Sequence, residues 1–404
     1  MSTHESTSSV QARAGTSAPT VPSSASSAER TLRSLLATVD IRVNGDRPWD
    51  LQVHTDQLYN RLLAGGRLAA GETYMDGWWD CEALDAFFFR VLRANLHEAL
   101  RTSPRFLWDM LKAKLFNLQS PSRAYQVGEQ HYDRGNDLYE AMLDRRMTYS
   151  CGYWAEADTL DEAQEAKLDL LCQMLELEPG HRVLDVGCGW GSFLQYAAET
   201  YGVEGVGITV SDEQVRSARE RCAALPVEIR LQDYRDLDGT FDRIVSVGML
   251  EHVGPKNYRT FMETMKAALK DDGLLLLQSI GSSTSTSTAG PWINKYIFPN
   301  GVIPSARQLA TAAEGLWVME AWRNIGPHYD PTLMAWHRNV KAHWDALKDA
   351  YDERFRRMWR YYLLASAGNF RARRNQVWQI LYSHDGRLGS RPETPPAGRI
   401  APRR

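Results

Sequence analysis

The acidic side chain best placed for chemistry is Glu251, in the stretch VGMLEHVG. The apolar run before it, FDRIVSVGM, has the pattern of a buried strand, so Glu251 falls at the carboxyl end of that strand. Ligands and reacting groups gather at this edge of open α/β sheets. A carboxylate there can orient or move a proton, and the alternative interpretation is an acid in the first turn of a helix. The neighbouring His252 is expected to be a packed, hydrogen-bonded side chain.

A glycine-rich loop provides a second chemical signal. In VLDVGCGWGSF, Gly187, Gly189 and Gly191 allow a sharp backbone turn and close approach to a ligand. Asp185 precedes them in the strand. The spacing D-x-G-x-G-x-G differs from the G-x-G-x-x-G that is typical of NAD-binding loops. A loop of this kind between a strand and a helix indicates a nucleoside-containing cofactor.

Two residues at the ends of the next strands distinguish between cofactors. Thr209 ends the second strand, where NAD enzymes place an acid that binds the ribose. Asp233, in LQDYRDL, ends the third strand, and its carboxylate can accept a hydrogen bond from an adenine amino group. Together with the glycine spacing, these residues predict an S-adenosylmethionine (SAM) site and therefore a methyltransferase.

Alternating strands and helices must position these residues. Several strands are continuously apolar, which is typical of a parallel sheet covered on both faces. The expected segments are helix 159–177, strand 181–187, helix 192–202, strand 203–209, helix 211–225, strands 227–233 and 241–249, helix 256–273 and strand 274–280. Capping boxes are expected at Thr159 with Glu162 and at Ser211 with Gln214. The fold class is therefore α/β, a doubly wound, mostly parallel, Rossmann-like methyltransferase sheet.

The remaining sequence divides into two tails, a small domain and a lid. Residues 1–30 and 385–404 lack the large apolar side chains needed to offset chain entropy, so both tails are expected to be disordered. Residues 31–120 are expected to form a smaller N-terminal α+β domain. Residues 121–384 are expected to form the methyltransferase domain, with a helical lid at about 282–381. The aromatic stretch GETYMDGWWDC is interpreted as a docking surface or as ordinary packing.

Composition excludes several other functions. A net charge of −3 argues against a globally basic nucleic-acid-binding protein. The five cysteines form no CxxC pair, so we expect no metal site, no disulfide framework and a cytoplasmic location. No apolar run is long enough to cross a bilayer. Peripheral contact with the inner face of the membrane is expected from the helix around 106–116, with packing against the next domain as the alternative, and from a basic cluster. The cluster consists of Arg354, Arg356, Arg357 and Arg360.

Eight motifs together resemble the cyclopropane-fatty-acid-phospholipid synthases, relatives of the mycolic acid cyclopropane synthases. They are, in order, HYDRGNDLYEAMLD, MTYSCGYW, LDVGCGWGS, GITVSDEQ, MLEHVGPKNY, WINKYIFPNG, YDPTLMAW and NFRARRNQVWQ, and the similarity runs from about Val39 to Leu381. The resemblance implies methylene transfer from SAM to the cis double bond of an unsaturated phospholipid acyl chain. A carbocation would form in the chain, and a bound bicarbonate ion would remove the proton as the ring closes.

The resemblance also assigns cofactor contacts beyond the glycine loop. The residues concerned, some of them already singled out, are Tyr149, Ser150, Thr209, Gln214 and Tyr234. Thr209 and Gln214 can hydrogen-bond the ribose hydroxyls, which agrees with the missing acid at the end of the second strand. Aromatic faces near the carbocation would stabilise its charge. The candidates for this role are Tyr132, Tyr149, Tyr153 and Phe298.

By the same resemblance, the bicarbonate would be held by backbone groups at Cys151 and Ile280 and by the side chain of Glu251. Two positions depart from the family pattern. Gln278 stands where many members carry a histidine, and His337 follows a tryptophan where many members carry a tyrosine. A glutamine can hydrogen-bond an anion but carries no proton charge, whereas an imidazole can be neutral or cationic.

The resemblance further implies a homodimer, and it implies that the N-terminal domain of residues 31–120 docks onto a membrane, a lipid or a second subunit. It leaves other functions open. Loss of a proton without ring closure would give a methylene-branched acyl chain, which a reductase could convert to a methyl branch. A methyltransferase for a soluble metabolite and a non-catalytic lipid-binding module are the alternatives from other classes. The long lid and the N-terminal domain argue against the first, and the intact glycine loop and Glu251 argue against the second.

Overall fold

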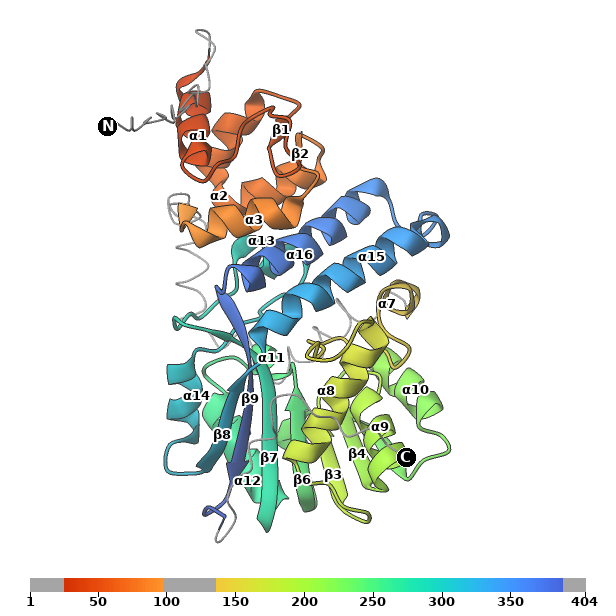
Figure 1. Cartoon of the computed structure of the whole chain (residues 1–404). Helices are drawn as coiled ribbons and strands as arrows, with labels where there is room; N and C mark the ends of the chain where they lie inside the picture. The colour runs from red at the N-terminus through yellow and green to blue at the C-terminus, as the bar shows by residue number, and fades with distance from the viewer. Residues whose placement is uncertain (1–24, 97–135, 388–404) are drawn as a thin grey trace, which may run out of the picture.

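The computed structural model describes residues 25–96 and 136–387. A small N-terminal unit forms one end of the molecule, and a sheet covered by helices forms the other (Figure 1). Two long helices, α15 (Tyr329–Leu347) and α16 (Glu353–Arg371), lie between these two parts. Every helix within the described ranges is too short or too polar to span a bilayer.

The large sheet has seven strands in the order β5-β4-β3-β6-β7-β9-β8. The first five of these strands run parallel, while β9 is antiparallel to both of its neighbours. The bounds are β3 (Arg182–Val186), β4 (Glu204–Thr209), β5 (Val227–Leu231), β6 (Phe241–Val247), β7 (Leu269–Ser282), β8 (Val318–Asn324) and β9 (Asn375–Ser383). The expected mostly parallel α/β sheet is therefore confirmed.

Helices connect the parallel strands and cover both faces of the sheet (Figure 1). They are α8 (Leu160–Met174), α9 (Ser192–Tyr201), α10 (Asp212–Arg221), α11 (Leu250–Val253) and α12 (Tyr258–Ala268). Three further helices are α7 (Asn136–Met142), α13 (Pro291–Tyr296) and α14 (Ala306–Ala313). The capping box of Thr159 and Glu162 is present at the start of α8.

The expected lid at 282–381 is wrong in part, because this segment supplies β8 and most of β9 to the sheet. The strand β9 lies between β7 and β8, and its residues from Val377 to Ser383 are all buried. A continuously buried strand shows no alternation of apolar and polar residues, so periodicity does not separate it from a buried helix. Outside the sheet, this segment contains the 283–305 stretch with α13, then α14, and later α15 and α16, and a lid function for these parts stays a prediction.

The N-terminal unit contains three helices and a two-stranded sheet, as expected for a small α+β domain. Its elements are α1 (Ser27–Ala37), β1 (Gln52–Val53), α2 (Gln57–Met75), β2 (Trp79–Asp80) and α3 (Leu84–Arg93). The helix α1 begins inside the stretch 1–30 that was expected to be a tail, because Ser26 caps it and Leu32 and Leu36 bury its apolar face. The expectations for residues 1–24, 388–404, the helix at 106–116 and Tyr132 lie outside the described residues.

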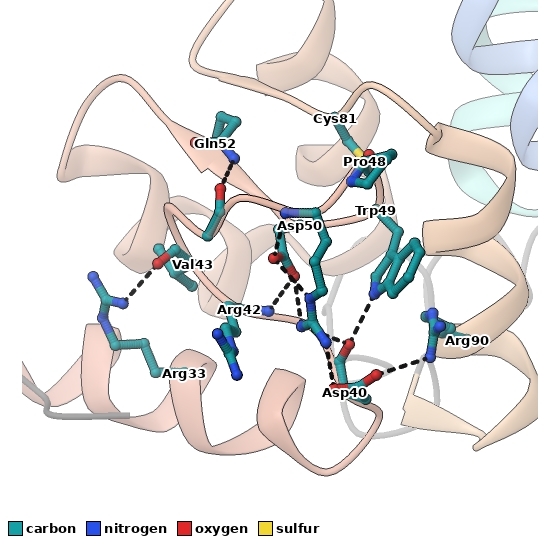
Figure 2. A network of polar contacts seen from close by, with 12 residues as sticks. Arg33, Asp40, Arg42, Val43, Pro48, Trp49, Asp50, Gln52, Cys81 and Arg90 are labelled. Carbon is teal, nitrogen blue, oxygen red and sulfur yellow. Dashed lines mark hydrogen bonds and ion pairs between the residues drawn. The ribbon is translucent and has the colours of Figure 1, made fainter. Parts of the chain in front are cut away.

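A buried carboxylate organises the loop between α1 and β1 (Figure 2). Asp50 is almost fully buried and accepts hydrogen bonds from the backbone N–H groups of Arg42 and Arg47, at 2.7 and 3.1 Å. The Arg47 guanidinium donates two more, at 3.0 and 2.8 Å, and also pairs with Asp40. Burial raises the pKa of Asp50, but these donors outweigh it and hold the pKa below its ordinary value. Hydrogen bonds and ion pairs to Asp50 therefore stabilise this loop in a unit that contains very little sheet.

The arginines of α16 attach the N-terminal unit to the rest of the molecule. Arg357 donates to the Tyr74 and Trp79 carbonyls at 2.6 and 2.9 Å and to the Asp80 carboxylate at 2.8 Å. Arg360 donates to the Tyr74 hydroxyl and to the carbonyls of residues 81 and 82. These two members of the basic cluster therefore bind the N-terminal unit.

The aromatic stretch GETYMDGWWDC forms the end of α2, a turn and β2. Tyr74 and Trp79 are almost fully buried, and both rings pack against Tyr361 of α16, at 5.5 and 6.4 Å. Trp292 of α13 contacts the same Tyr361 ring at 4.6 Å. The stretch therefore packs against α13 and α16, as the interpretation of ordinary packing expects.

Replacing Arg357 with methionine should lower the free energy of unfolding by about 2–3 kcal/mol, because two buried carbonyls and a carboxylate lose a charged donor. Thermal or urea unfolding measures this loss. The matched control is Arg356→Met, because Arg356 is exposed and pairs with Glu353 of its own helix. The control should change stability by no more than about 0.5 kcal/mol. Equal losses in the two variants would contradict the docking role.

Candidate functional site

A cavity opens at the carboxyl ends of the parallel strands, where the sequence places its candidates. Nine of the ten expected cofactor-binding residues line it. They are Tyr149, Ser150, Asp185, Gly187, Gly189, Thr209, Gln214, Asp233 and Tyr234. The sequence-based site for a cofactor is therefore one continuous cavity in the folded chain.

The glycine loop follows β3 and is fixed to the neighbouring strand. The N–H groups of Gly187 and Cys188 both donate to the Ile208 carbonyl of β4, at 2.9 and 3.0 Å. Gly187 and Gly189 have φ angles of +83° and +56°, which favour glycine. A Cβ atom at Gly189 would meet no atom within 4 Å, so this residue borders open space in the cavity wall.

Gly191 is the tenth expected residue, and it has a different surrounding. A Cβ atom here would lie 3.2 Å from the Cβ of Ala218 and 3.3 Å from the sulfur of Cys222. Both of these residues belong to α10 or its end. Gly191 therefore allows α9 to pack closely on α10, and the described cavity wall does not include it.

Thr209 and Gln214 form a buried pair at the end of β4. The Thr209 hydroxyl donates to the Gln214 side-chain oxygen at 2.7 Å, which leaves the amide nitrogen of Gln214 as the donor for a ligand. Ser211 caps the Gln214 backbone N–H at 3.3 Å. The expected capping box is therefore only half formed, because the Gln214 side chain bonds Thr209.

Asp233 and Tyr234 lie at the end of β5. The Asp233 carboxylate binds the guanidinium of Arg235 at 2.9 and 3.1 Å, so it shares its acceptor capacity with a cation. The Tyr234 hydroxyl is buried without a hydrogen-bond partner within the described residues. Burial raises the pKa of this phenol to about 12. Both side chains line the cavity and remain candidates for the adenine end of a cofactor.

A buried lysine in the cavity wall escaped the sequence reasoning. Lys167 of α8 is almost fully buried, and its ammonium donates to the Ser150 hydroxyl at 3.1 Å. Gln164, one turn earlier, donates to the Ser150 carbonyl at 2.8 Å. The two side chains of α8 thus hold the segment that carries Tyr149 and Ser150. A glutamine and a lysine three residues apart on an otherwise apolar helix face were the available signal.

Burial moves the charged groups around Lys167 towards their neutral forms. It lowers the pKa of Lys167 to about 8, and the opposing attraction of Asp144 and Asp185 is smaller. It raises the pKa of Asp185 to about 7 against the attraction of Lys167. Both shifts have the same main cause, so desolvation outweighs charge attraction here.

Glu251 and Ile280 are brought together next to this cavity. The Ile280 N–H donates to the Glu251 carboxylate oxygen Oε1 at 2.5 Å. The second oxygen, Oε2, is buried and has no hydrogen-bond partner in the described chain. Burial raises the pKa of Glu251 to about 7, against smaller lowering effects of the Ile280 N–H and Ser279. The acid is therefore partly protonated near neutral pH.

Cys151 belongs to the same apolar cluster as Ile280 and Tyr149. Its thiol is buried, which raises its pKa well above the ordinary value. The adjacent Gly152 N–H donates to the Thr332 hydroxyl of α15 at 3.1 Å. A neutral, buried thiol is a poor nucleophile, so its backbone is the part suited to ligand binding.

Gln278 and His337 have surroundings that the sequence did not indicate. The oxygen of the Gln278 amide accepts a hydrogen bond from Gln379 of β9 at 2.9 Å, directly across the sheet. His337 does not reach the described cavity wall, and the charged groups near it include Arg360 and Asp85. Burial, with a smaller effect of Arg360, lowers the pKa of His337 to about 4. A role of His337 at the anion therefore stays a prediction.

Aromatic rings connect Glu251's surroundings with the cofactor cavity. Phe298 contacts the rings of His252 and Tyr362, each at 5.9 Å. The Tyr362 hydroxyl is hydrogen-bonded to that of Tyr149 at 2.9 Å. Tyr153 is another expected carbocation contact, but its ring already makes a cation–π contact with the Arg323 guanidinium, which lies 4.9 Å from the ring centre. Tyr149 and Phe298 therefore remain candidates, and Tyr362 joins them.

His252 differs from the packed, hydrogen-bonded side chain expected from the sequence. It lines the cavity, and its Nδ1 atom is buried without a hydrogen-bond partner in the described chain. Burial lowers its pKa to about 4, so the ring is neutral at physiological pH. A neutral ring is compatible with a positively charged sulfonium cofactor nearby, which a cationic ring would repel.

The fold and the cavity together define a SAM-dependent methyltransferase. A solved structure of the mycolic acid cyclopropane synthase CmaA1, complexed with SAH and CTAB, is similar in fold with a TM-score of 0.60 and 31% sequence identity. The similarity covers 64% of this chain and 97% of that one. The strand order and the glycine loop at the carboxyl ends of the strands agree with this class.

Comparison with known proteins defines the family. The family described as mycolic acid cyclopropane synthetase matches residues 119–380. The cyclopropane-fatty-acyl-phospholipid synthase of Escherichia coli (strain K12) is 52% identical over 90% of this chain and 95% of its own length. A tuberculostearic acid methyltransferase of Mycobacterium tuberculosis is 33% identical over 82% of each chain. The chain belongs to the cyclopropane synthase family.

Replacing Gly189 with alanine should weaken binding of S-adenosylhomocysteine (SAH) at least about tenfold, because the added methyl group would occupy cavity space in which the cofactor lies against the loop backbone. Isothermal titration calorimetry measures the affinity. Gly315→Ala is the matched control, since Gly315 also has a positive φ and open space but lies in an exposed turn outside the cavity wall. Both variants should lose about 1 kcal/mol of stability from backbone strain. Normal SAH affinity in a folded Gly189→Ala protein would contradict the assignment.

Proposed function

We propose that this protein transfers a methylene group from SAM to the cis double bond of unsaturated phospholipid acyl chains, forming a cyclopropane ring. The strongest support from relatives is the 52% identity to a protein named for this activity, over nearly the whole of both chains. Burial of the catalytic candidates supports an acceptor that is apolar. A soluble metabolite and a purely structural role have no comparable support.

The chemistry determines what the residues must do. Bound SAM supplies an electrophilic methyl group, and an alkene is a weak nucleophile that must be held in line with it. A bond forms between the methyl carbon and one alkene carbon while the bond from the methyl carbon to the sulfonium sulfur breaks, so that S-adenosylhomocysteine leaves with that electron pair and the positive charge moves to the other alkene carbon. The methyl carbon then loses a proton to a base, and the electron pair of its C–H bond closes the ring. The protein must exclude water from the site during both steps, since water would react with the cation.

Three aromatic side chains are suited to the cationic stage. Tyr149 lines the cofactor cavity, and Tyr362 and Phe298 continue from it towards Glu251. The faces of such rings attract positive charge. Because the Tyr149 and Tyr362 hydroxyls bind one another, their oxygens are less available to attack the cation. These rings can therefore stabilise the charge without forming a bond to it.

The observation that carries the proton-transfer step is the incomplete hydrogen bonding of Glu251. One of its oxygens binds the Ile280 N–H, and the other is buried without a partner in the described chain. A buried carboxylate oxygen of this kind is costly unless a ligand donates to it. A bicarbonate hydroxyl fits that need, and the Ile280 and Cys151 backbone would complete its surroundings. Bicarbonate would supply the base for the last proton.

Membrane contact and dimerisation belong to the same proposal. A phospholipid acyl chain is reached only at a bilayer, so contact with the inner face of the membrane follows from the acceptor. Arg357 and Arg360 bind the N-terminal unit and are not free for lipid head groups. A second subunit would double the lipid contacts of each particle and so raise its residence on the membrane.

Replacing Glu251 with glutamine should lower turnover about 10²-fold while leaving SAH affinity nearly unchanged, because the lost charge acts on the later proton transfer. In the parent, activity should fall as pH drops through about 7, since the carboxylate must be ionised to accept the hydrogen bond. The same raised pKa makes the folded protein lose stability as pH rises from 4.5 through about 7. The glutamine variant should lack both dependences.

Rates over pH 5.5–8.5 at fixed bicarbonate concentration, with thermal unfolding at each pH, test this role of Glu251. Glu263→Gln is the control, because Glu263 is an exposed glutamate of α12 that pairs with Arg259. An acid limb that persists unchanged in Glu251→Gln would assign the titration to another group.

The product should show cyclopropane ring protons in the proton NMR spectrum of lipids extracted from vesicles after turnover. Mass alone is insufficient, because a ring and a methylene branch add the same atoms. The second candidate, a branched product, has support from the relative named a tuberculostearic acid methyltransferase. Vinylic methylene signals in place of ring signals would favour it. Co-sedimentation with the same vesicles tests membrane contact, and failure to sediment would contradict it.

A further inference from the structure

The N-terminal unit packs tightly against α13 through a contact between α2 and α13. Trp292 of α13 is nearly fully buried and lies directly over Gly71 of α2. A Cβ atom at Gly71 would come within 2.2 Å of the Trp292 ring. The indole N–H of Trp292 also points to the sulfur of Met75, at 3.4 Å. Glycine at position 71 is therefore what permits α13 to lie against α2.

A single carboxylate beside this contact binds α13 by charge. Glu72 accepts from the Lys295 ammonium at 2.6 Å and from the Tyr296 hydroxyl at 3.1 Å. Its other oxygen accepts from Arg61 of its own helix at 3.0 Å. Burial raises the pKa of Glu72, and its donors, Lys295 first, outweigh this and lower the pKa below its ordinary value. The carboxylate is therefore ionised, and the contact persists over the physiological pH range.

The residues that follow α13 form part of the cavity wall. Ile297 is fully buried, Phe298 contacts His252, and Pro299 and Asn300 line the cofactor cavity. The Asn300 N–H donates to the side chain of Asn294 within α13 at 2.9 Å, so the turn and the helix are fixed to each other. A displacement of α13 would therefore displace the wall.

The far end of the same segment is attached to Glu251. The Val302 N–H donates to the backbone carbonyl of Glu251 at 2.8 Å, and the hydroxyl of Tyr258 is 3.4 Å from the Val302 carbonyl. The segment 297–302 is thus held by the N-terminal unit at one end and by the candidate acid at the other. Between these attachments it borders the space where the cofactor and the acyl chain must meet.

We propose that Gly71 and Glu72 of the N-terminal unit position the 297–302 segment and so set the affinity of the catalytic cavity for its cofactor. The N-terminal unit is then a part of the active site, although it supplies no residue to the cavity wall. The family match begins at residue 119, so this contact is an addition to the catalytic part that the family shares. The inference rests on the proposed function only in taking the cavity as the SAM site.

The main experiment compares two buried acids that each bind across the boundary between the two parts. Glu72→Gln removes the charge that binds α13, whereas Asp85→Asn removes a contact with Arg371 of α16 at 2.7 Å. The two carboxylates are equally buried, with 13% and 14% of their side chains exposed. Arg371 keeps its bonds to Asp330 in the control. The two variants therefore differ mainly in which element they release.

Calorimetry with SAH, without lipid, gives the decisive readout. Glu72→Gln should weaken SAH binding about fivefold or more, whereas Asp85→Asn should leave it within about twofold of the parent. The midpoint of thermal unfolding should decrease in both variants, because Glu72→Gln loses its ion pairs with Lys295 and Arg61 and Asp85→Asn loses its ion pair with Arg371. A general weakening of the domain contact would shift SAH affinity equally in both variants, and that result, or no shift in either, would overturn the proposal.

A charge exchange provides the rescue. Glu72→Lys alone places two ammonium groups together and should reduce SAH affinity more than Glu72→Gln does. Combining Glu72→Lys with Lys295→Glu restores an ion pair of reversed polarity and should recover most of the affinity. Absence of recovery in a folded double variant would show that the Glu72–Lys295 bond does not act on the wall. Because SAH binding needs no acyl acceptor, these results stand whichever lipid product the enzyme forms.

Discussion

Backbone carbonyls of the N-terminal unit and the guanidinium groups of α16 that bind them fix this unit to the rest of the molecule. The unit contains little sheet, and the carbonyls at its turns and helix ends, some of which already accept a backbone N–H as Tyr74 does from Gly77, take further partners from outside the unit. Arg357 and Arg360 supply these partners, and Arg374 adds the carbonyl of Leu92 at the end of α3. On its other face α16 presents Tyr362 to Tyr149. The helix α16 therefore donates hydrogen bonds to the N-terminal unit and also contacts Tyr149 in the cavity wall.

Desolvation gives the site its chemical character. Lys167, Asp185 and Glu251 all have pKa values shifted towards the neutral form by burial. Such a region contains little fixed charge until a charged ligand enters, so each ligand charge interacts strongly with its few polar neighbours. A positive charge on a hydrocarbon chain needs this kind of surrounding, because any nearby water would react with it. The neutral ring of His252 fits the same requirement.

The sequence predicted the parts of the site that depend on local conformation. The glycine spacing specifies a turn, and the cavity indeed contains Gly187 and Gly189. Lys167 was missed because its role depends on a distant loop, which an amphipathic helix pattern does not show. The role of His337 stays a prediction: its neighbour Trp336 contacts the Tyr149 ring at 5.1 Å, and burial lowers the pKa of the His337 imidazole. The β9 strand was missed because continuous burial has no period.

All five cysteines lie in the described part of the chain, and all are buried. Burial raises the pKa of Cys81 to about 12 and that of Cys222 to about 11, so the reactive thiolate is scarce at neutral pH. We therefore expect thiol reagents to react more slowly with the native protein than with an exposed thiol. These cysteines are spread over the N-terminal unit, the cavity surroundings and the packed helices. The order in which an added thiol reagent labels these cysteines would therefore show which region opens first, and no engineered probe is needed.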